Sequence, residues 1–284
     1  MDWIRGIQRA IDYMEENLTE EIDYAEVAER AYSSSFHFQR TFNILTDMTV
    51  GEYIRNRRLS QAGEELSVAH AKVIDVALKY GYDSPESFTK AFTRFHGVTP
   101  SEARKEGVIL KSFKRLSISL TLKGGKIMEY QIAKKDSFHV LVKTKSFLME
   151  TCESLVPEFW AESNKDGTLQ VLCKHGIKNE LLGLCAPESE KTFRYGIGIE
   201  CPKDTVAPKG YEVWNLSAHT WVVFRCVGPM PSAVRELNHR IYSEFFPQSE
   251  FEPTGDIDFE LYPDECDKLD YSAEIWIPVR KKAE

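Results

Sequence analysis

The sequence lacks an apolar run long enough to cross a bilayer, and no basic segment followed by an apolar stretch stands at its start. It also lacks an excess of positive charge, because its formal net charge is −8. Phosphate contacts need a basic surface, so this balance argues against indiscriminate attraction to polyanions. We therefore expect a soluble, cytoplasmic protein that has no membrane partner.

Cysteine is scarce and never clustered, since the six cysteines form no CxxC pair and there is no HExxH motif. We expect buried free thiols rather than disulfides or zinc ligands. Gly196-Ile197-Gly198 lacks the third glycine of a dinucleotide-binding loop, and no nucleophile elbow is present. The sequence therefore predicts no cofactor, no metal site and no enzyme.

The chain has the composition of a globular protein, with 42% hydrophobic and 28% charged residues, and its 284 residues suffice for two domains. Helical periodicity ends near residue 107, and a polar, β-branched connector follows. Beyond it the hydrophobic pattern alternates. We expect domains at residues 1–107 and 126–284, joined by a linker at 108–125.

A repeat dominates the first domain. The segment at 27–42, VAERAYSSSFHFQRTF, returns at 76–92 as VALKYGYDSPESFTKAF. Phe38 aligns with Phe88, and Phe42 aligns with Phe92. These phenylalanines recur at the spacing of a buried helix face. Repetition on this scale predicts a domain of two helix-turn-helix units.

Helix-start signals support the same interpretation. Ser34 and Ser84 precede the second helix of each unit. Capping boxes, each with a threonine and a glutamate three residues later, begin at Thr49 and Thr99. The first helix is predicted from one apolar stripe at Ile4, Ile7, Ile11, Met14 and Leu18.

In a helix-turn-helix unit the second helix enters the major groove, and its early residues reach base edges. The polar faces of these helices carry His37, Gln39, Arg40 and Thr41 in the first unit and Glu86, Ser87, Lys90 and Thr93 in the second. Arginine and glutamine side chains can pair with guanine and adenine edges. Two such helices are expected to read adjacent major grooves, roughly 34 Å apart. The alternative is a solvated helix face without a ligand.

More specific motifs complete this domain: Phe38-Gln39-Arg40, Tyr53-Ile54-Arg55, and FHGVTPSEAR at 95–104. Through them residues 1–107 resemble the DNA-binding domain of the AraC/XylS family. The resemblance implies a transcription regulator with double-stranded promoter DNA and RNA polymerase as partners. By position it implies base contacts from Phe36, Gln39, Arg40, Glu86, Ser87 and Lys90. Phe36 replaces a tryptophan of well-studied members, and the acid Glu86 predicts weak or backbone-only reading by the second unit.

The second domain shows alternating patterns typical of strands. Expected strands span residues 128–133, 138–147, 181–185, 193–201, 211–216, 221–227, 257–262 and 273–279, with helices at 151–163 and 231–246. The order β-β-α-β-β thus occurs twice. We expect an all-α domain followed by an α+β domain of two pseudo-symmetric halves, with helices on one face and a central groove.

Acidic and aromatic residues alternate in two of these strands. Side chains two residues apart share a face, so Glu274 is expected beside Trp276, and Glu260 beside Tyr262. A carboxylate beside aromatic rings suits a lipophilic cation, which gains charge complementarity and cation–π attraction. The aromatic wall is expected to continue through Tyr195, Trp214, Trp160 and Trp221. Core packing of the rings and exposed strand edges for the acids are the alternatives.

Three segments, YGIGI at 195–199, DFELYP at 258–263 and EIWIPV at 274–279, resemble the GyrI-like effector-binding domain. The resemblance implies ligand-site acids at Glu260 and Glu274, with Glu260 the stronger candidate. Together the two resemblances imply a regulator whose small-molecule effector is aromatic, lipophilic or cationic. Because some GyrI-like proteins are hydrolases, the alternative is hydrolysis of a lipophilic electrophile with Glu274 as general base.

Overall fold

The computed structural model describes residues 3–68, 71–118, 127–189, 192–263 and 272–282. The chain divides into two compact units. The helical unit contains Asp2–Ser35 and Met48–Thr121, and the sheet unit contains Phe36–Asp47 and Leu122–Glu284. Cys266 and residues 119–125 of the expected linker lie outside the described residues.

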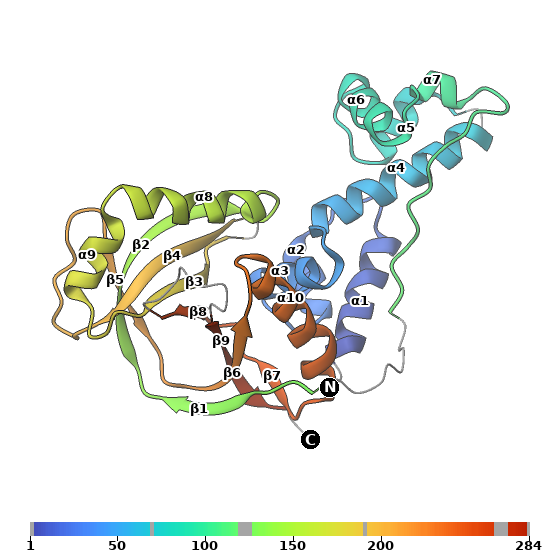
Figure 1. Cartoon of the computed structure of the whole chain (residues 1–284). Helices are drawn as coiled ribbons and strands as arrows, with labels where there is room; N and C mark the ends of the chain where they lie inside the picture. Colours follow the sequence, from blue (N-terminus) through green and yellow to red (C-terminus); the bar gives the residue numbers. More distant parts are fainter. Residues whose placement is uncertain (1–2, 69–70, 119–126, 190–191, 264–271, 283–284) are drawn as a thin grey trace. The chain divides into compact units, whose positions relative to one another are not determined.

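The helical unit is built from the elements of the predicted repeat. It contains α1 (Trp3–Glu16), α2 (Tyr24–Arg30), α4 (Val50–Val68), α5 (Val73–Lys79), α6 (Pro85–His96) and α7 (Pro100–Ala103) (Figure 1). The apolar stripe of α1 is buried as predicted, with Ile11 and Met14 almost inaccessible. The second helix of the first repeat, α3 (Ser35–Thr46), groups with the sheet unit instead.

Both predicted capping boxes are confirmed. Thr49 Oγ1 accepts the amide hydrogen of Glu52 at 3.1 Å, and the Glu52 carboxylate accepts the amide hydrogen of Thr49 at 2.8 Å. Thr99 and Glu102 repeat this exchange at the start of α7. Such caps satisfy backbone donors that the first helical turn leaves unpaired.

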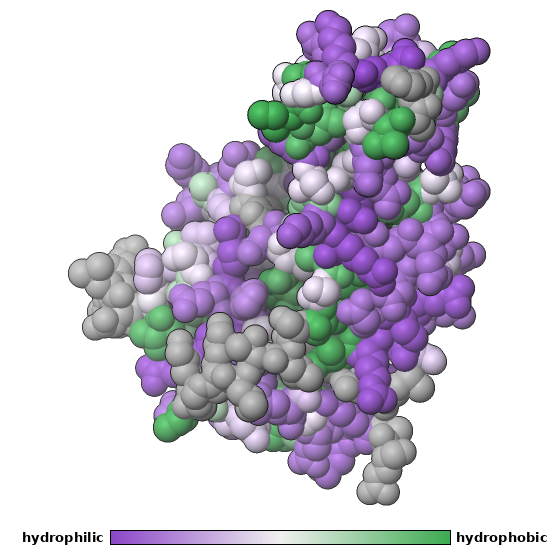
Figure 2. Space-filling view, turned by 90° about the vertical axis from the view of Figure 1, so that its right-hand side faces the viewer, coloured by the Kyte–Doolittle hydropathy of each residue, from purple (hydrophilic) through white to green (hydrophobic). Residues whose placement is uncertain are grey.

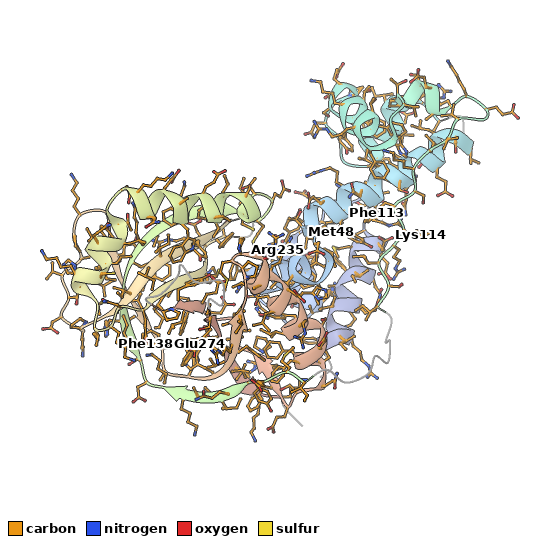
Figure 3. All side chains as sticks on the ribbon, viewed as in Figure 1. Met48, Phe113, Lys114, Phe138, Arg235 and Glu274 are labelled. Atoms are coloured by element: carbon orange, nitrogen blue, oxygen red, sulfur yellow. The ribbon has the colours of Figure 1, made fainter. Side chains whose placement is uncertain are left out.

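The connector after α7 is fixed along α4 by backbone hydrogen bonds. The amide of Lys111 donates to Nδ1 of the buried His96, whose Nε2 lies 2.9 Å from the carbonyl oxygen of Leu59. Burial lowers the pKa of His96, which keeps the ring neutral. Further along, the amide of Phe113, a residue labelled in Figure 3, donates to Ser60 Oγ at 3.0 Å.

Within the described residues, nine strands form one antiparallel sheet. They are β1 (Gln131–Lys135), β2 (Phe138–Leu148), β3 (Leu181–Pro187), β4 (Thr192–Cys201), β5 (Glu212–Leu216), β6 (His219–Val227), β7 (Phe251–Pro253), β8 (Asp258–Tyr262) and β9 (Ser272–Lys281). Their order is β1-β6-β9-β8-β3-β4-β2-β5, and β7 pairs with β9. All eight predicted strands are present, whereas β7 was not predicted.

Helices cover one face of this sheet. They are α8 (Cys152–Lys165), α9 (Thr168–His175), α10 (Ser232–Arg240), the π-helical turn η1 (Ile241–Phe245) and α11 (Phe246–Gln248). The predicted helix at 231–246 is therefore helical but changes geometry at Ile241. Figure 1 shows α8 and α9 across β2 and β4. The first half has the order β-β-α-α-β-β, and the second half ends in three strands, so α9 and β7 depart from the predicted order. The pseudo-symmetry of the halves remains a prediction.

Two apolar clusters fill the opposite faces of the sheet. On the helix-covered face, Ile197 and Ile199 pack with Phe159 of α8 and Leu172 of α9. On the other face, here called the pocket face, the buried residues include Trp221. The two sets alternate along β2, where Val140 and Val142 belong to the pocket-face cluster and Leu141 to the other, as the pleat of a strand requires.

Figure 2 shows one face of the molecule, on which hydrophilic residues cover most of the area. Cys185, Cys201 and Cys226 are buried as predicted. Cys173 is exposed, which corrects the expectation of burial. It lies on α9, a helix that the sequence did not predict, and points to its solvent side.

Candidate functional site

Two carboxylates of β8 share the helix-covered face. Asp258 and Glu260 are two residues apart, so both side chains leave the strand on one side. Asp258 pairs with Cys185 of β3, and Glu260 pairs with Gly183. A side chain added at Gly183 would overlap the hydroxyl of Tyr195 and crowd the Glu260 carboxylate. The bare backbone at Gly183 therefore makes the room for this carboxylate.

Aromatic side chains surround Glu260. The hydroxyls of Tyr195 and Tyr262 each donate to Glu260 Oε2 at 3.2 Å. Trp160 Nε1 donates to the Tyr195 hydroxyl at 2.9 Å, and its ring meets Tyr262 edge-on with 5.2 Å between centroids. We call Trp160, Tyr195, Glu260 and Tyr262 the Glu260 cluster. All four were named in the sequence analysis, Glu260 as a ligand-site acid and the three rings as parts of the aromatic wall.

The electrostatics of this cluster depend on burial. Burial raises the pKa of Glu260, while the charge of Arg40 and the two tyrosine hydroxyls oppose that rise. Burial and then the Glu260 charge raise the pKa of Tyr195 well above its usual value. Burial also raises the pKa of Cys185 to about 12. The phenol and the thiol therefore stay protonated near neutral pH, and the carboxylate is stabilised by any cation that reaches it.

The positively charged side chain of Arg40 lies beside this cluster. Arg40 of α3 forms an ion pair with Asp258, between Nη1 and Oδ2. The two side chains are only 18% and 10% exposed, so water screens the pair weakly. Burial opposes the charge of Arg40, but Cys185, Tyr242 and Glu260 nearby raise its pKa, and the guanidinium stays charged.

The rest of α3 is also covered within the sheet unit. Phe36 is 5% exposed and packs on Phe193 with 6.0 Å between ring centroids. Gln39 is 6% exposed. His37 lies beside Tyr242, and burial, followed by the charge of Arg40, lowers the pKa of His37 to about 4. The alternative of a solvated face on this helix is therefore wrong, and contact of Phe36, Gln39 and Arg40 with bases remains a prediction.

The corresponding helix of the second repeat has the opposite environment. In α6, Glu86, Ser87 and Lys90 are all exposed. Ser84 caps the helix by accepting the amide hydrogen of Ser87 at 3.1 Å, as the sequence predicted. Contact of these three residues with bases remains a prediction.

Glu274 and Trp276 lie on the pocket face, away from Glu260. They pair with Leu261 and Phe259 of β8, whose side chains point opposite to that of Glu260. Trp276 Nε1 donates to Glu274 Oε2 at 2.8 Å, and Phe259 stacks on the indole at 5.4 Å. The single cleft expected for both acids is thus corrected to two separate places.

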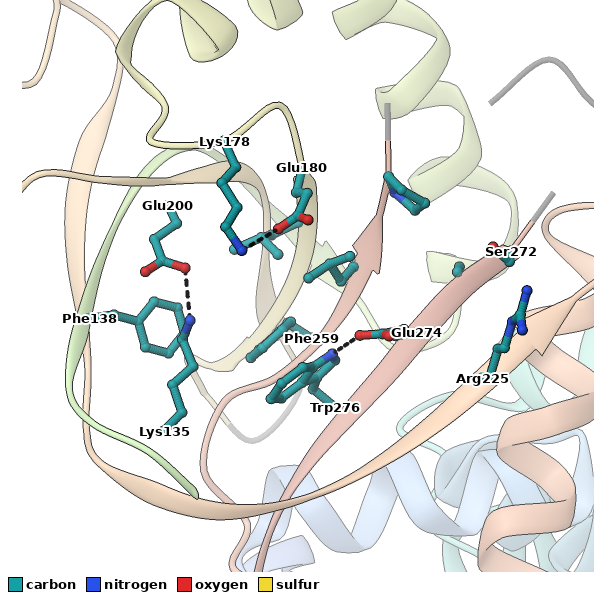
Figure 4. A pocket seen from close by; sticks show the side chains of 14 residues that line it. Lys135, Phe138, Lys178, Glu180, Glu200, Arg225, Phe259, Ser272, Glu274 and Trp276 are labelled. Carbon is teal, nitrogen blue, oxygen red and sulfur yellow. Dashed lines mark hydrogen bonds and ion pairs between the residues drawn. The ribbon is translucent and has the colours of Figure 1, made fainter. Parts of the chain in front are cut away.

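A cavity of about 480 Å³ opens at Glu274 (Figure 4). Its charged rim includes two ion pairs, Lys135 with Glu200 at 2.8 Å and Lys178 with Glu180 at 3.7 Å. Trp214 does not line this cavity. Its Nε1 donates to Glu212 at 3.0 Å, and the guanidinium of Arg194 lies 5.2 Å from its ring.

Asp258 and Gly183 were missed by the sequence analysis. Asp258 precedes Glu260 by two residues, so the same alternation that paired Glu260 with Tyr262 also places Asp258 on that face. Gly183 carries no comparable signal, because its role depends on the pairing of β3 with β8. The role of Arg40 beside Asp258 depends on a contact across 218 residues of sequence.

Across the residues that the structure describes, no three histidine, cysteine, aspartate or glutamate side chains lie close enough to hold a metal ion. In the same residues, no helix has both the length and the apolar character needed to span a membrane.

Comparison with known protein families gives two matches. Residues 131–279, just over half of the chain, match the integron-associated effector binding proteins. Residues 27–106 match a helix-turn-helix domain. The effector-binding match covers the whole sheet from β1 to most of β9, and the helix-turn-helix match includes α3 and α6.

Individual relatives are similar over parts of the chain. The transcriptional activator AarP of Providencia stuartii is 39% identical over 95 residues, which are 34% of this chain and 70% of AarP. The transcriptional regulator Rob of Salmonella typhimurium is 34% identical over 105 residues, or 37% of this chain and 36% of Rob. The solved structure of SAV2435 bound to tetraphenylphosphonium is 25% identical, covers 54% of this chain and 94% of its own, and has a TM-score of 0.48.

Proposed function

The chain belongs to the AraC-type family of DNA-binding transcription regulators and carries an integron-associated effector-binding domain, and we propose that its effector is a lipophilic cation bound at Glu260. The observation that carries the proposal is a largely buried carboxylate surrounded by three aromatic side chains.

A cation suits this cluster better than a neutral or anionic ligand. A buried carboxylate without a full counter-charge costs free energy, and a bound cation offsets that cost. The rings of Trp160 and Tyr262 are partly exposed beside the buried Tyr195, and the faces of such rings attract positive charge. An anion would meet Glu260 and Asp258 as like charges.

The helix-turn-helix domain supplies the DNA-binding part of the proposal. Glu86, Ser87 and Lys90 are exposed at the start of α6, where a recognition helix contacts bases and phosphates. Phe36, Gln39 and Arg40 are the corresponding residues of α3. We propose promoter DNA as the target and RNA polymerase as a further partner. The hydrolase alternative, with Glu274 as general base, gains no support from relatives that are transcription regulators.

The effector proposal is tested by calorimetry on the full chain with tetraphenylphosphonium, a cation whose charge lies inside an aromatic shell. Its neutral counterpart is triphenylphosphine oxide. Glu260→Gln should weaken cation binding about tenfold and leave the neutral compound nearly unaffected, because only the charge interaction is removed. Glu274→Gln is the matched control on the pocket face and should change neither affinity.

Equal weakening of both compounds by Glu260→Gln would contradict a charge-based site. Loss of cation binding in Glu274→Gln alone would move the effector site to the cavity on the pocket face.

A further inference from the structure

Arg40 forms a buried ion pair with Asp258 beside the Glu260 cluster. We propose that Asp258 and Glu260 form a receptor for a planar guanidinium- or amidinium-type cation, which Arg40 occupies in this structure and from which an effector of the same chemistry displaces it. The inference rests on the proposed function, because it assumes that the effector binds at Glu260. It adds the chemical class of the effector's head group and a consequence for α3.

The donor and acceptor geometry favours a planar cation with N–H groups. A guanidinium presents its donors in a fixed fork that matches carboxylate oxygens. Asp258 already accepts such a group from Arg40, and Glu260 shares its face of β8. A quaternary ammonium or phosphonium has no N–H donor. It would satisfy the charge of Glu260 but not the hydrogen-bonding capacity of Asp258.

The Arg40–Asp258 pair is largely buried rather than a surface salt bridge. Asp258 is 7% exposed, and the apolar cluster on the helix-covered face includes both Phe36 and Cys185. Removing one partner of a buried pair leaves the other charge uncompensated, so one cation is replaced by another more readily than it is simply lost. Displacement therefore requires a cation that satisfies the same carboxylates.

Displacement has a consequence for DNA. Arg40 is one of the residues proposed to contact a base, and its guanidinium cannot pair with Asp258 and with a base edge at the same time. An effector that pairs with Asp258 and Glu260 thus favours the DNA-competent state of α3, since it binds only when Arg40 has left. In this arrangement the effector and promoter DNA assist each other's binding.

The test uses the full chain and benzamidine, which carries a planar amidinium on an aromatic ring. Arg40→Ala removes the resident cation and should tighten benzamidine binding about tenfold, because the site no longer has to be vacated first. Asp258→Asn should weaken it. Arg194→Ala is the matched control: it breaks the Arg194 pair with Glu212 and should leave benzamidine binding unchanged.

Arg40→Gln serves as a second variant, because it removes the charge while keeping a polar side chain of similar length. Unchanged or weaker benzamidine binding in the folded Arg40 variants would overturn the inference. Hydrogen exchange supplies an independent readout: benzamidine should speed exchange of the α3 amides in the parent chain. No change there would also overturn it.

Failure of this inference can be told apart from failure of the proposed function. Benzyltrimethylammonium has the charge and ring of benzamidine but no N–H donor. If it and tetraphenylphosphonium bind in a Glu260-dependent way while the Arg40 variants leave benzamidine binding unchanged, the cation site stands and the displacement of Arg40 is refuted. If no cation responds to Glu260→Gln, the proposed function itself fails.

Discussion

At Glu260, three effects act on one carboxylate. Burial removes water and raises the pKa, an uncompensated cost on the order of several kcal/mol for a fully buried ion. The hydrogen bonds from the hydroxyls of Tyr195 and Tyr262 stabilise the charged carboxylate and offset part of that cost. The positive charge of Arg40 offsets a larger part. The carboxylate is therefore responsive to any change in nearby positive charge.

The raised pKa gives a pH dependence with a definite sign. Tetraphenylphosphonium does not titrate, so its affinity should follow the charge of Glu260. It should be weak at low pH, increase as the pH rises through the elevated pKa of Glu260, and become constant above it. Tyr195, Arg40 and Cys185 do not change charge in this range, because the pKa of each is raised.

The unfolding free energy should change in the opposite direction. Burial raises the pKa of Glu260 in the folded state above its unfolded value, so protonated Glu260 stabilises the folded chain. This stabilisation is complete below the unfolded pKa and is lost as the pH rises through the folded pKa. Isothermal titration and urea unfolding across this range, with Glu260→Gln as the control, measure both trends. A parent and variant with parallel pH profiles would contradict the assignment to Glu260.

Among the elements, α3 and α6 show how far local sequence determines structure. Both helices were predicted from equivalent signals, namely Ser34 and Ser84 at their starts and paired phenylalanines on their inner faces. Both helices form as predicted. Their outer faces differ, because α3 is buried in the sheet unit and α6 is exposed. Burial by a distant part of the chain leaves no periodic signal in the helix itself.

Short elements were also beyond sequence prediction. The helix α9 has eight residues and follows Gly167, which adopts a left-handed conformation. Two turns are too few to establish a 3.6-residue period. The strand β7 has three residues, too few for an alternating pattern. By contrast, the longer strands and the capping boxes were predictable because each carries its own repeated local signal.

The exposure of α6 leads to a prediction for DNA binding. Lys90→Ala should weaken binding to a duplex selected from a random pool by about 1 kcal/mol and reduce the salt dependence by about one counterion, if Lys90 contacts a phosphate. Lys203→Ala removes an exposed lysine from the sheet unit and is the control for the loss of one positive charge. Fluorescence anisotropy at several salt concentrations measures both. Matching curves for the two variants would exclude Lys90 from the interface.

On the scale of the whole molecule, strand pairing decides which predicted residues form one site. Alternation along each strand was readable, so Glu260 with Tyr262 and Glu274 with Trp276 were correctly placed on shared faces. The pairing register of β8 and β9 could not be predicted from the sequence. A shift of the register by one residue would move every side chain of one strand to the opposite face of the sheet. The observed register pairs Glu260 with Ile275 and separates the two acids.

The proposed effector site and the two proposed DNA-contacting helices are distributed over both units of the chain. The sheet unit holds the carboxylates of β8 and α3, the first of the two helices proposed to contact DNA, while the helical unit holds α6, the second. A regulator so divided responds to its effector through α3, whose Arg40 is shared between an acidic site and the proposed DNA contact. The central claim is therefore that occupation of the Asp258 and Glu260 receptor by a small cation strengthens DNA binding.

The most direct test is the dissociation constant of the full chain for a selected duplex, measured by fluorescence anisotropy with saturating benzamidine and with its neutral counterpart benzamide. We predict binding about tenfold tighter with benzamidine, no effect of benzamide, and equally tight binding without ligand for Asp258→Asn. The account would be contradicted if the parent chain bound the duplex equally well with benzamidine and with benzamide, and if Asp258→Asn without ligand bound it no more tightly than the parent chain.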